Sequence, residues 1–314
     1  MNNKCVICYS SDENYYDILK ISIDSLIETS NPNHNYEIHI IYADAPSIPK
    51  LKSKYNSKNI TIVLHELNKN QRDDYNTKNL KGWELRVTHA TYYRFEIPKI
   101  IQSDWCIYLD CDIIIKHDIY NLWNERDDKY SLCAIRDAGN PYKCGKKMYR
   151  HPENYFNAGV LLMNLKALRN MNFDQKWKDV EAKHGHCEAD QGILNIMFNN
   201  DVKILPLKYN MFYLYLDKPL SVQYPASTYS KKMKSEAAHD PYIIHYVGTK
   251  GTEIMRKKYG KEKYTLRNGY SKYNLKALFI IVVFIILLVL IYKCVNYYIK
   301  INRCFDNYII NTRC

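Results

Sequence analysis

The sequence predicts an α/β fold in which helices cover a parallel sheet, and three observations support this. Short apolar runs alternate with helical patterns, beginning as strand, helix, strand, helix and strand over residues 5–65. Parallel neighbours need crossover connections, which the intervening helices supply. A further apolar run ends in two carboxylates, as expected where a buried strand reaches a ligand site. With 314 residues, the chain can bury one large core or two smaller ones.

Each expected element has its own signal in the chain. Residues 14–29 carry apolar side chains at helical spacing, and an Asn-Pro-Asn run ends that helix. Residues 88–101 are expected to be helical despite Pro98. Residues 139–152, rich in Gly, Lys and Tyr, are expected to form a loop over the site. The expected strands cover residues 5–10, 36–42, 60–65, 105–109, 129–135, 156–165 and 242–247, and the expected helices cover residues 14–29, 47–55, 88–101 and 189–198.

The most informative stretch is WCIYLDCD at residues 105–112, an apolar run that ends in Asp110 and Asp112. On an extended backbone, positions i and i+2 point to the same side, so both carboxylates are expected to face one site. Two carboxylates so close repel each other unless a cation neutralises them, and such oxygen ligands suit magnesium, manganese or calcium. The pair therefore indicates a metal site for a phosphorylated substrate. The alternative is two solvated aspartates in a turn.

The end of the chain carries a basic run followed by an apolar one. The formal net charge is +12, and much of the excess lies within residues 250–276. Residues 277–292 contain no charge, no Gly and no Pro, and as a helix they would span about 24 Å. A hydrocarbon core of about 30 Å is slightly thicker, but the flanking lysines can snorkel. We expect a basic juxtamembrane linker at 261–276, a transmembrane helix at 277–293 and a short tail at 294–314, with a buried core helix as the alternative.

Other features of the chain bear on its location. The apolar run near the N-terminus is too short for the apolar core of a signal peptide. Positive charge is denser before the predicted span than after it, which favours a cytosolic main domain and a single-pass C-terminal anchor. The ten cysteines form no Cys-x-x-Cys and are interpreted as reduced. The cluster HGHC at 184–187 is interpreted as a loop, because no second ligand group lies at zinc-finger spacing. The apolar segment favours a membrane over nucleic acid as the partner of the basic run.

Several short motifs occur in a characteristic order. They are SDENY at 11–15, ATYYRF at 90–95, YLDCD at 108–112, IRD at 135–137, YFNAGV at 155–160, DQGILN at 190–195 and HYVG at 245–248. In this order and at these separations, the set resembles glycosyltransferase family 8, which includes bacterial lipopolysaccharide galactosyltransferases and glycogenin. The resemblance covers roughly residues 4–250. Each motif alone is weak, but the ordered set is specific.

The resemblance implies a GT-A fold over residues 1–260, a Rossmann-like nucleotide-diphospho-sugar transferase with a mixed, mostly parallel central sheet. It also implies retaining transfer of a sugar from a UDP-sugar, with a divalent metal that is usually manganese. Asp110 and Asp112 match the family's Asp-x-Asp, which holds the metal on the diphosphate, and His245 matches a third ligand. Imidazole beside carboxylates suits manganese better than magnesium, the alternative ion. Such a cation stabilises the negative charge that develops on UDP.

The resemblance also assigns residues to the nucleotide and the sugar. Asp12 and Asn14 match positions that contact the uridine, and Asp12 could also cap a helix. Arg94 matches a basic residue near the donor sugar and phosphates, with a surface ion pair as the alternative. The positions around the donor sugar are matched by polar side chains that can bind hydroxyls, namely Asp137, Asn157, Asp190 and Gln191.

Retention of configuration leaves two mechanisms open. Gln191 matches a residue near the face that a nucleophile would use, but an amide is a poor nucleophile. Front-face transfer is therefore favoured, in which the departing phosphate takes the acceptor proton. Asp190 is the nearby carboxylate that could support two successive inversions instead. A helix N-cap is the simpler interpretation of Asp190, and a turn or cap is the simpler one for Asn157 and Asn195.

The last motif departs from the family pattern, which continues as His-x-x-Gly-x-x-Lys-Pro-Trp. Here the chain reads HYVGTKGT from 245 to 252, so Gly248 keeps its place, Lys250 comes one residue early and Pro-Trp is missing. The role of Lys250 on the diphosphate is therefore open. Gly251 is expected to let the loop readjust, and Thr249 or Arg256 to replace the lysine in part.

Two classes of function follow from the sequence. The first is a membrane-anchored, metal-dependent retaining hexosyltransferase that uses UDP-glucose or UDP-galactose and a glycan, glycolipid or protein acceptor. A glycogenin-like variant would glycosylate its own tyrosine, and Tyr213 and Tyr215 lie in the comparable region. The second is a catalytically degenerate transferase fold that acts as a membrane-bound binding or scaffold protein, supported mainly by the altered Lys250 motif. A basic binder without enzymatic activity would leave the carboxylates unexplained.

Overall fold

The computed structural model describes residues 4–73, 88–137, 152–184, 189–216 and 229–260. By its internal contacts the chain divides into residues 1–261 and 262–314, and every described residue belongs to the first unit. The predicted linker, transmembrane helix and tail lie outside the described residues, as do most of the loop at 139–152 and of the cluster at 184–187. Within the described ranges, no helix combines the length and apolarity needed to cross a membrane.

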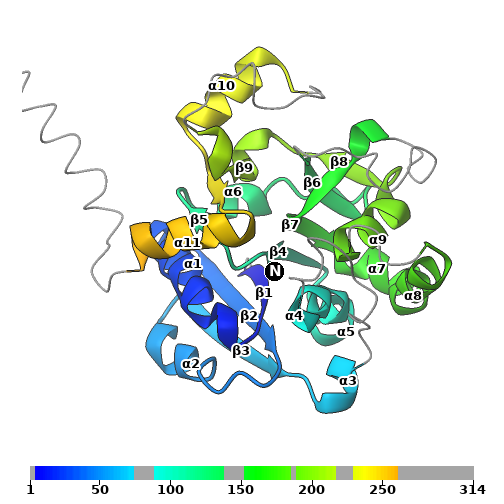
Figure 1. Cartoon of the computed structure of the whole chain (residues 1–314), viewed down its shortest axis with the longest axis horizontal. Coiled ribbons are helices and arrows are strands. Elements are labelled where there is room, and N and C mark those ends of the chain that lie inside the picture. The colour runs from blue at the N-terminus through cyan, green and yellow to red at the C-terminus, as the bar shows by residue number, and fades with distance from the viewer. Residues whose placement is uncertain (1–3, 74–87, 138–151, 185–188, 217–228, 261–314) are drawn as a thin grey trace, which may run out of the picture. The chain divides into compact units, whose positions relative to one another are not determined.

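A mixed sheet of seven strands forms the centre of the described part (Figure 1). Every neighbouring pair is parallel except the two pairs of β7, which runs against β4 and β6. The predicted mixed, mostly parallel sheet is confirmed. In spatial order the strands are β3 (Ile60–Glu66), β2 (Asn35–Tyr42), β1 (Lys4–Ser11), β4 (Trp105–Leu109), β7 (Phe156–Asn164), β6 (Leu132–Arg136) and β8 (Val202–Ile204).

The central strands are largely apolar because helices cover both faces of the sheet. Every residue of β4 and β7 is buried. The strands β1 and β2 pair without a break from Lys4 opposite Asn35 to Ser11 opposite Tyr42. The cysteines of the described ranges are free and buried, and they pack as small apolar residues.

A second, small sheet carries one residue of the later site. It consists of β5 (Ile113–Ile115), β10 (Ile243–His245) and β9 (Met211–Phe212), with β10 in the middle. The strand β10 runs antiparallel to β5, which places His245 opposite Ile113. The last residue of β10 therefore lies beside the turn that precedes β5.

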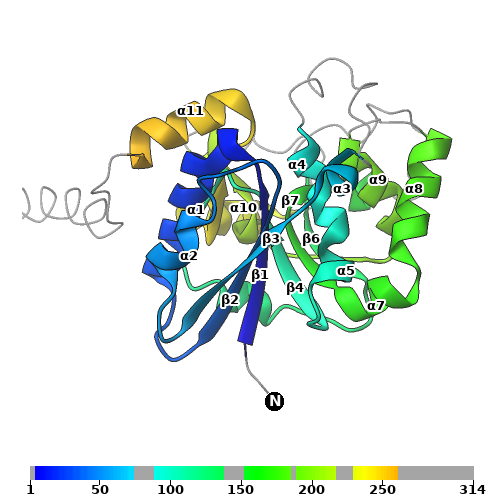
Figure 2. The same cartoon turned by 90° about the horizontal axis from the view of Figure 1, so that it is seen from below.

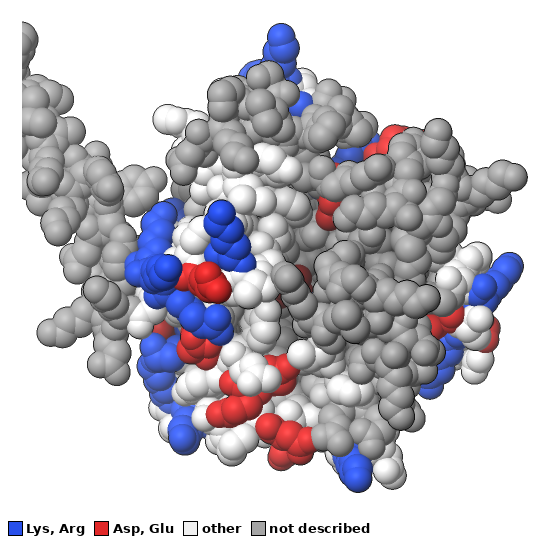
Figure 3. Space-filling view, in the orientation of Figure 1, with Lys and Arg blue, Asp and Glu red and all other residues white. Residues whose placement is uncertain are grey.

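Helices lie on both sides of the large sheet (Figure 2). The strands stand between α1, α2 and α11 on one side and α4, α5, α7, α8 and α9 on the other. Lysine and arginine side chains gather over α11, at the left of Figure 3. The α-helices are α1 (Tyr16–Thr29), α2 (Lys50–Tyr55), α3 (Lys69–Asp73), α4 (His89–Tyr92), α5 (Ile97–Ile100), α6 (Tyr120–Trp123), α7 (Leu165–Asn170), α8 (Phe173–His184), α9 (Ala189–Phe198), α10 (Lys231–His239) and α11 (Gly248–Tyr259). The 3-10 helices are η1 (Glu13–Tyr15), η3 (Tyr93–Glu96), η4 (Pro152–Asn154), η5 (Leu207–Tyr209) and η6 (Tyr213–Tyr215).

Two expectations about helices need correction. The segment 88–101 is not one helix but α4, η3 and α5 in succession. Pro98 lacks an amide hydrogen, so it fits only the first turn of a helix, and α5 accordingly starts at Ile97. The segment after His245 is not a loop, because α11 begins at Gly248. The helix at 189–198 agrees with α9.

Candidate active site

A pocket of about 360 Å³ opens where β1 and β4 end. This is the edge at which open α/β sheets bind their ligands. The described residues that line it come from many parts of the chain and include Asp12, Tyr15, Arg94, Asp110, Asp112, Gly159, Asp190, Gln191, Gly248 and Thr249.

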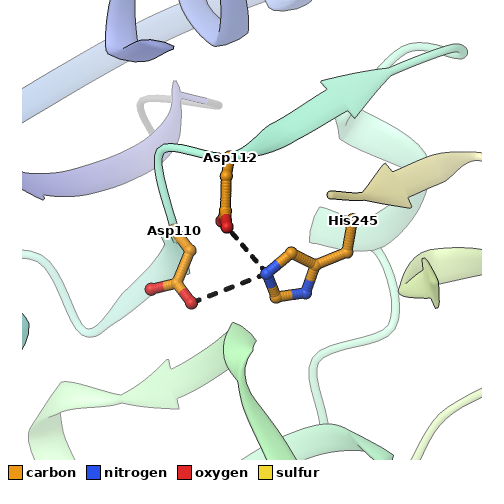
Figure 4. A group of neighbouring side chains, drawn as sticks. All are labelled: Asp110, Asp112 and His245. Atoms are coloured by element: carbon orange, nitrogen blue, oxygen red, sulfur yellow. Dashed lines mark hydrogen bonds and ion pairs between the residues drawn. The ribbon is translucent and has the colours of Figure 1, made fainter. Parts of the chain in front are cut away.

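Three predicted metal ligands meet beside this pocket, which two of them, Asp110 and Asp112, also line (Figure 4). Asp110, Asp112 and His245 each offer one ligand atom, and these atoms lie within 4.8 Å of one another. The Nε2 atom of His245 is 3.1 Å from Asp112 Oδ1 and 3.8 Å from Asp110 Oδ2. Contrary to the expectation of an extended strand, both aspartates lie in the turn between β4 and β5. The pairing of β10 with β5 brings His245 to that turn, where Tyr246 N donates to Asp112 O over 2.7 Å.

Gly159 leaves the space in which these ligands approach one another. A Cβ atom at this position would lie 2.3 Å from His245 Cε1 and 2.6 Å from Asp110 Oδ2. The backbone also passes close by, since Asp110 N donates to Gly159 O over 2.8 Å. Two carboxylates and one imidazole in such a space fit a divalent ion that accepts oxygen and nitrogen ligands.

The side chain of His245 is 3% exposed and lies among acidic groups. Burial alone would lower its pKa, but the carboxylates of Asp112 and Asp110 raise the pKa above the ordinary value for histidine. The other ring nitrogen, Nδ1, lies 2.9 Å from Asn210 Oδ1. Both ring nitrogens therefore have defined partners.

Arg94 is buried at 3% exposure, so the surface ion pair considered from the sequence is wrong. Its guanidinium lies 2.9 Å from Asp110 Oδ1 and 3.0 Å from Asp190 Oδ2. It also donates to Ala158 O over 2.7 Å and lies over the ring of Tyr108. Burial works against the charge, but Asp190, Tyr108 and Asp110 raise the pKa of Arg94, so the cation is retained.

The side chains assigned to the donor sugar form one hydrogen-bonded group. Asn157 Nδ2 donates to Asp137 Oδ2 over 3.0 Å and to Gln191 Oε1 over 3.1 Å. Gln191 Nε2 donates to Asp137 Oδ2 over 3.2 Å and to Tyr155 Oη over 2.9 Å. Its Oε1 also accepts from Ala158 N over 3.1 Å, so the amide of Gln191 is held at both ends.

Asp190 lies in the first turn of α9 rather than before the helix. It is 5% exposed and paired with Arg94. Burial raises the pKa of Asp190 to about 6, while Arg94 opposes this rise. Asn195 is not a cap either, because its amide bonds to the backbone N and O of Phe156 and joins α9 to β7.

The residues predicted for the uridine differ in their positions. Asp12 lines the pocket and also caps η1, since its Oδ1 accepts from Asn14 N and Tyr15 N. The cap is therefore confirmed, whereas the contact of Asp12 with the uridine stays a prediction. Asn14 is exposed, and its carbonyl accepts from Arg256 Nη2 over 3.4 Å.

The altered last motif forms the start of α11. Gly248 and Thr249 line the pocket, whereas Lys250 is exposed and is not among the described lining residues. Gly251 lies in a helix and not in a loop, and it allows the backbone to pack closely against Tyr246. A Cβ atom at position 251 would lie 2.1 Å from Tyr246 O. Arg256 forms an ion pair with Asp17, which ties α11 to α1.

Sequence reasoning missed several residues of the site. Tyr108 donates to Asp110 Oδ1 over 2.8 Å. This contact could have been predicted, because residues two apart on a strand point to the same side. Gly159 was named within a motif without a role. Asn210 carries no local signal, because only the fold brings it beside His245.

Comparison with known proteins agrees with this geometry. The profile of "Glycosyl transferase family 8" matches residues 6–251, and the chain belongs to this family. It is 28% identical to the glycosyltransferase GlyB of Streptococcus pneumoniae, over 81% of this chain and 59% of that protein. It is 27% identical to a lipopolysaccharide 1,2-glucosyltransferase of Escherichia coli, over 77% of this chain and 71% of that protein.

Solved structures support the fold. An active-site mutant of LgtC matches with a TM-score of 0.63 and 20% identity, over 82% of this chain and 96% of that one. The bifunctional glycosyltransferase WbbM matches with a TM-score of 0.64 and 20% identity, over 79% of this chain and 46% of that one. The chain thus spans about three fifths of GlyB and less than half of WbbM. The GT-A-like α/β fold is confirmed.

Proposed function

We propose that this glycosyltransferase moves a hexose, glucose or galactose, from a UDP-sugar to an acceptor with retention of configuration, and that it uses Mn²⁺. The observation that carries the proposal is the convergence of Asp110, Asp112 and His245 beside a pocket at the sheet edge. The printed names of the relatives, which include a lipopolysaccharide 1,2-glucosyltransferase and the galactosyltransferase LgtC, support a hexose donor.

Asp110, Asp112 and His245 would hold the divalent ion. A bound ion would supply positive charge to the diphosphate as negative charge develops on it. Mixed oxygen and nitrogen ligands favour Mn²⁺ over Mg²⁺. Arg94 keeps Asp110 in place through an ion pair of 2.9 Å, so the ligand is oriented before any donor arrives.

The hydrogen-bonded group around Gln191 favours front-face transfer. In that reaction the acceptor oxygen bonds to the anomeric carbon as the bond from that carbon to UDP breaks, and the hydroxyl proton passes to the departing phosphate. Both the oxygen and the nitrogen of the Gln191 amide are already hydrogen-bonded, so neither is free to attack the anomeric carbon. The carboxylate of Asp190 is paired with Arg94. These contacts count against a covalent intermediate on either residue.

The first turn of α11 offers a substitute for the displaced lysine. Gly248 and Thr249 line the pocket at the start of this helix. The first N–H groups of a helix lack intrahelical partners and carry partial positive charge, so they suit a phosphate. The helix start would therefore contact the diphosphate at the place where the family pattern carries a lysine.

The acceptor is proposed to be a membrane-associated glycan, with a C-terminal anchor at residues 277–293 and the catalytic unit in the cytosol. The charge-free apolar run and the basic residues before it support this proposal. The basic side chains over α11 in Figure 3 are consistent with an anionic surface nearby. Self-glycosylation at Tyr213 or Tyr215 stays a prediction of the sequence.

Donor hydrolysis tests the proposal without knowledge of the acceptor. We expect the full-length protein to release UDP from UDP-glucose or UDP-galactose only when Mn²⁺ is present. Asp112→Ala is expected to abolish this release, because it removes one of the three ligands.

Asp104→Ala is the matched control, since Asp104 lies at the opposite end of β4 with its side chain 72% exposed. It is expected to leave release unchanged. If the wild-type protein releases no UDP from any UDP-sugar and shows no Mn²⁺-dependent UDP binding, the scaffold function is favoured instead.

A further inference from the structure

Asn210 lies between the predicted metal ligand His245 and the sugar-site residue Asn157, and it bonds to both. Its side chain is 1% exposed, so its polar atoms must find partners within the protein. Its Oδ1 lies 2.9 Å from His245 Nδ1, and its Nδ2 lies 2.9 Å from Asn157 Oδ1. One amide therefore connects the metal-site histidine to the group that surrounds Gln191.

The direction of these hydrogen bonds is fixed by a backbone group. Gly159 N–H can only donate, and it lies 2.9 Å from the side chain of Asn157, so that atom must be the oxygen Oδ1. The other amide atom of Asn157 faces Asp137 Oδ2 at 3.0 Å, and an ionised carboxylate only accepts. Asn157 therefore has one orientation.

The orientation of Asn157 dictates that of Asn210 and then that of the imidazole. Because Asn157 Oδ1 accepts, the facing atom of Asn210 must be its nitrogen, which turns the oxygen toward His245 Nδ1. That ring nitrogen must then carry a hydrogen. A neutral imidazole carries only one, so Nε2 keeps its lone pair, and Nε2 is the atom that faces Asp112 and Asp110.

We propose that Asn210 is a positioning residue, which holds His245 in the Nδ1–H tautomer so that Nε2 ligates the divalent ion. The backbone N–H of Gly159 sets this tautomer through Asn157 and Asn210. The inference rests on the proposed function in one respect, namely that the site holds a metal. Partners of this kind on a ligating histidine typically change metal affinity by about 10- to 100-fold.

Two substitutions of Asn210 separate positioning from mere packing. Asn210→Leu removes both hydrogen bonds at similar volume, and we expect Mn²⁺ affinity to fall by about tenfold or more. Asn210→Asp keeps an acceptor for His245 Nδ1 but loses the donor to Asn157. We therefore expect it to hold Mn²⁺ within about threefold of the wild-type affinity while the KM for the donor rises. Electron paramagnetic resonance titration of free Mn²⁺ measures the affinities in the full-length protein.

Asn164→Leu is the matched control. Asn164 is also a buried asparagine with two side-chain hydrogen bonds, but it lies at the far end of β7 from Gly159. We expect it to lower the melting temperature as Asn210→Leu does, without weakening Mn²⁺ binding. A purely structural role for Asn210 would make the two variants alike in both measurements.

A folded Asn210→Leu protein that binds Mn²⁺ as tightly as the wild type overturns the inference and leaves the proposed function intact. A wild-type protein that binds no Mn²⁺ overturns both. A second readout needs no variant of Asn210. In metal-free protein with ¹⁵N-labelled histidine at about pH 9, which lies well above the ordinary pKa of histidine, the His245 signals are identified by their loss in His245→Gln. The hydrogen is expected on Nδ1, and a hydrogen on Nε2 would contradict the proposal.

Discussion

Gly159 decides how closely the three ligands of the proposed metal site approach one another. In Gly159→Ala the new Cβ would stand 2.3 Å from His245 Cε1 and 2.6 Å from Asp110 Oδ2, closer than any stable contact. The ligands must separate, so we expect Mn²⁺ affinity to fall at least tenfold, in line with other losses of ligand geometry. Isothermal titration calorimetry with MnCl₂ measures this change.

The neighbouring variant Val160→Ala serves as the control for Gly159→Ala. Val160 is fully buried, and its truncation places no atom among the ligands. It should cost about 1–3 kcal/mol of stability and leave Mn²⁺ affinity unchanged. Equal Mn²⁺ affinity in Gly159→Ala and the wild type would show that the ligands do not meet at this glycine.

Arg94 pairs with the buried carboxylate of Asp190 and the partly buried one of Asp110, so its loss should destabilise the fold strongly. Arg94→Met leaves Asp110 and Asp190 without their cation, and we expect the free energy of unfolding to fall by about 3–5 kcal/mol in urea titrations. Arg256→Met removes an ion pair with Asp17 that is 40% exposed on the arginine side, and it should change stability by less than about 1 kcal/mol. Similar losses in the two variants would contradict the role given to Arg94.

At the residue scale, the proposed metal ligands could be predicted from the sequence, but the side chains that hold those ligands in position could not. Asp110, Asp112 and His245 stand in recognisable motifs, and the fold brings them together as expected. The amide of Asn210 meets His245 only because β9 pairs with β10, a contact that no spacing in the chain announces. The ion pairs of Arg94 likewise depend on three segments distant in sequence.

The strands β2 and β3 carry a pair of histidines that makes stability depend on pH. His39 Nδ1 lies 2.8 Å from His65 Nε2. Burial, and next the charge of His39, lower the pKa of His65 to about 4, from about 6.5 in the unfolded chain. Between these values the unfolded chain binds more protons, so stability is full above about pH 6.5 and falls as the pH drops toward 4.

We expect His65→Gln to remove on the order of 1–2 kcal/mol of this pH dependence, after allowance for partial exposure. The measurement is the free energy of unfolding in urea at several pH values between about 4 and 7. His117→Gln is the control, because His117 lies on the surface beside Asp240. A curve for His65→Gln that matches the wild type would refute the assignment.

Elements with strong periodicity could be predicted, whereas those shaped by tertiary contacts could not. The helix α9 agrees with its expected range because its apolar positions repeat regularly. The segment 88–101 has the same periodicity but breaks into three pieces around η3, where the side chain of Arg94 turns toward Asp110 and Asp190. The helix that begins at Gly248 was not predicted, because the residues after His245 were interpreted as the loop of a motif that this chain does not complete.

At the scale of the whole molecule, the proposed anchor can be tested by truncation. A chain of residues 1–260 should retain the melting temperature of the catalytic unit and stay in the supernatant after ultracentrifugation. The full-length protein should sediment with membranes, because residues 277–292 are apolar throughout.

A point substitution checks that the apolar run itself is responsible. Phe284→Lys in the full-length chain places a charge near the middle of the run, at a cost of about 2.5–3.5 kcal/mol for insertion. We expect this variant to shift toward the supernatant. Sedimentation of the 1–260 chain to the same extent as the full-length protein would rule out the anchor as the cause.

The parallel half of the sheet could be predicted from the order of strands and helices, but its other half could not. The βαβαβ pattern before residue 66 imposes parallel pairing of β1, β2 and β3. The reversed direction of β7 has no counterpart in its apolar sequence, since a fully buried strand looks the same in either direction. That reversal places the start of β7, with Asn157 and Gly159, beside the end of β4.

The position of His245 near the end of the described chain has a consequence for biosynthesis. During synthesis the segments of β1 to β4 and both aspartates emerge first, and the third proposed ligand follows only when residue 245 has emerged. Incomplete or prematurely terminated products therefore carry a carboxylate pair without its histidine. If the three residues hold the ion as proposed, such fragments lack one ligand, and we expect them not to consume the nucleotide sugar of the cell.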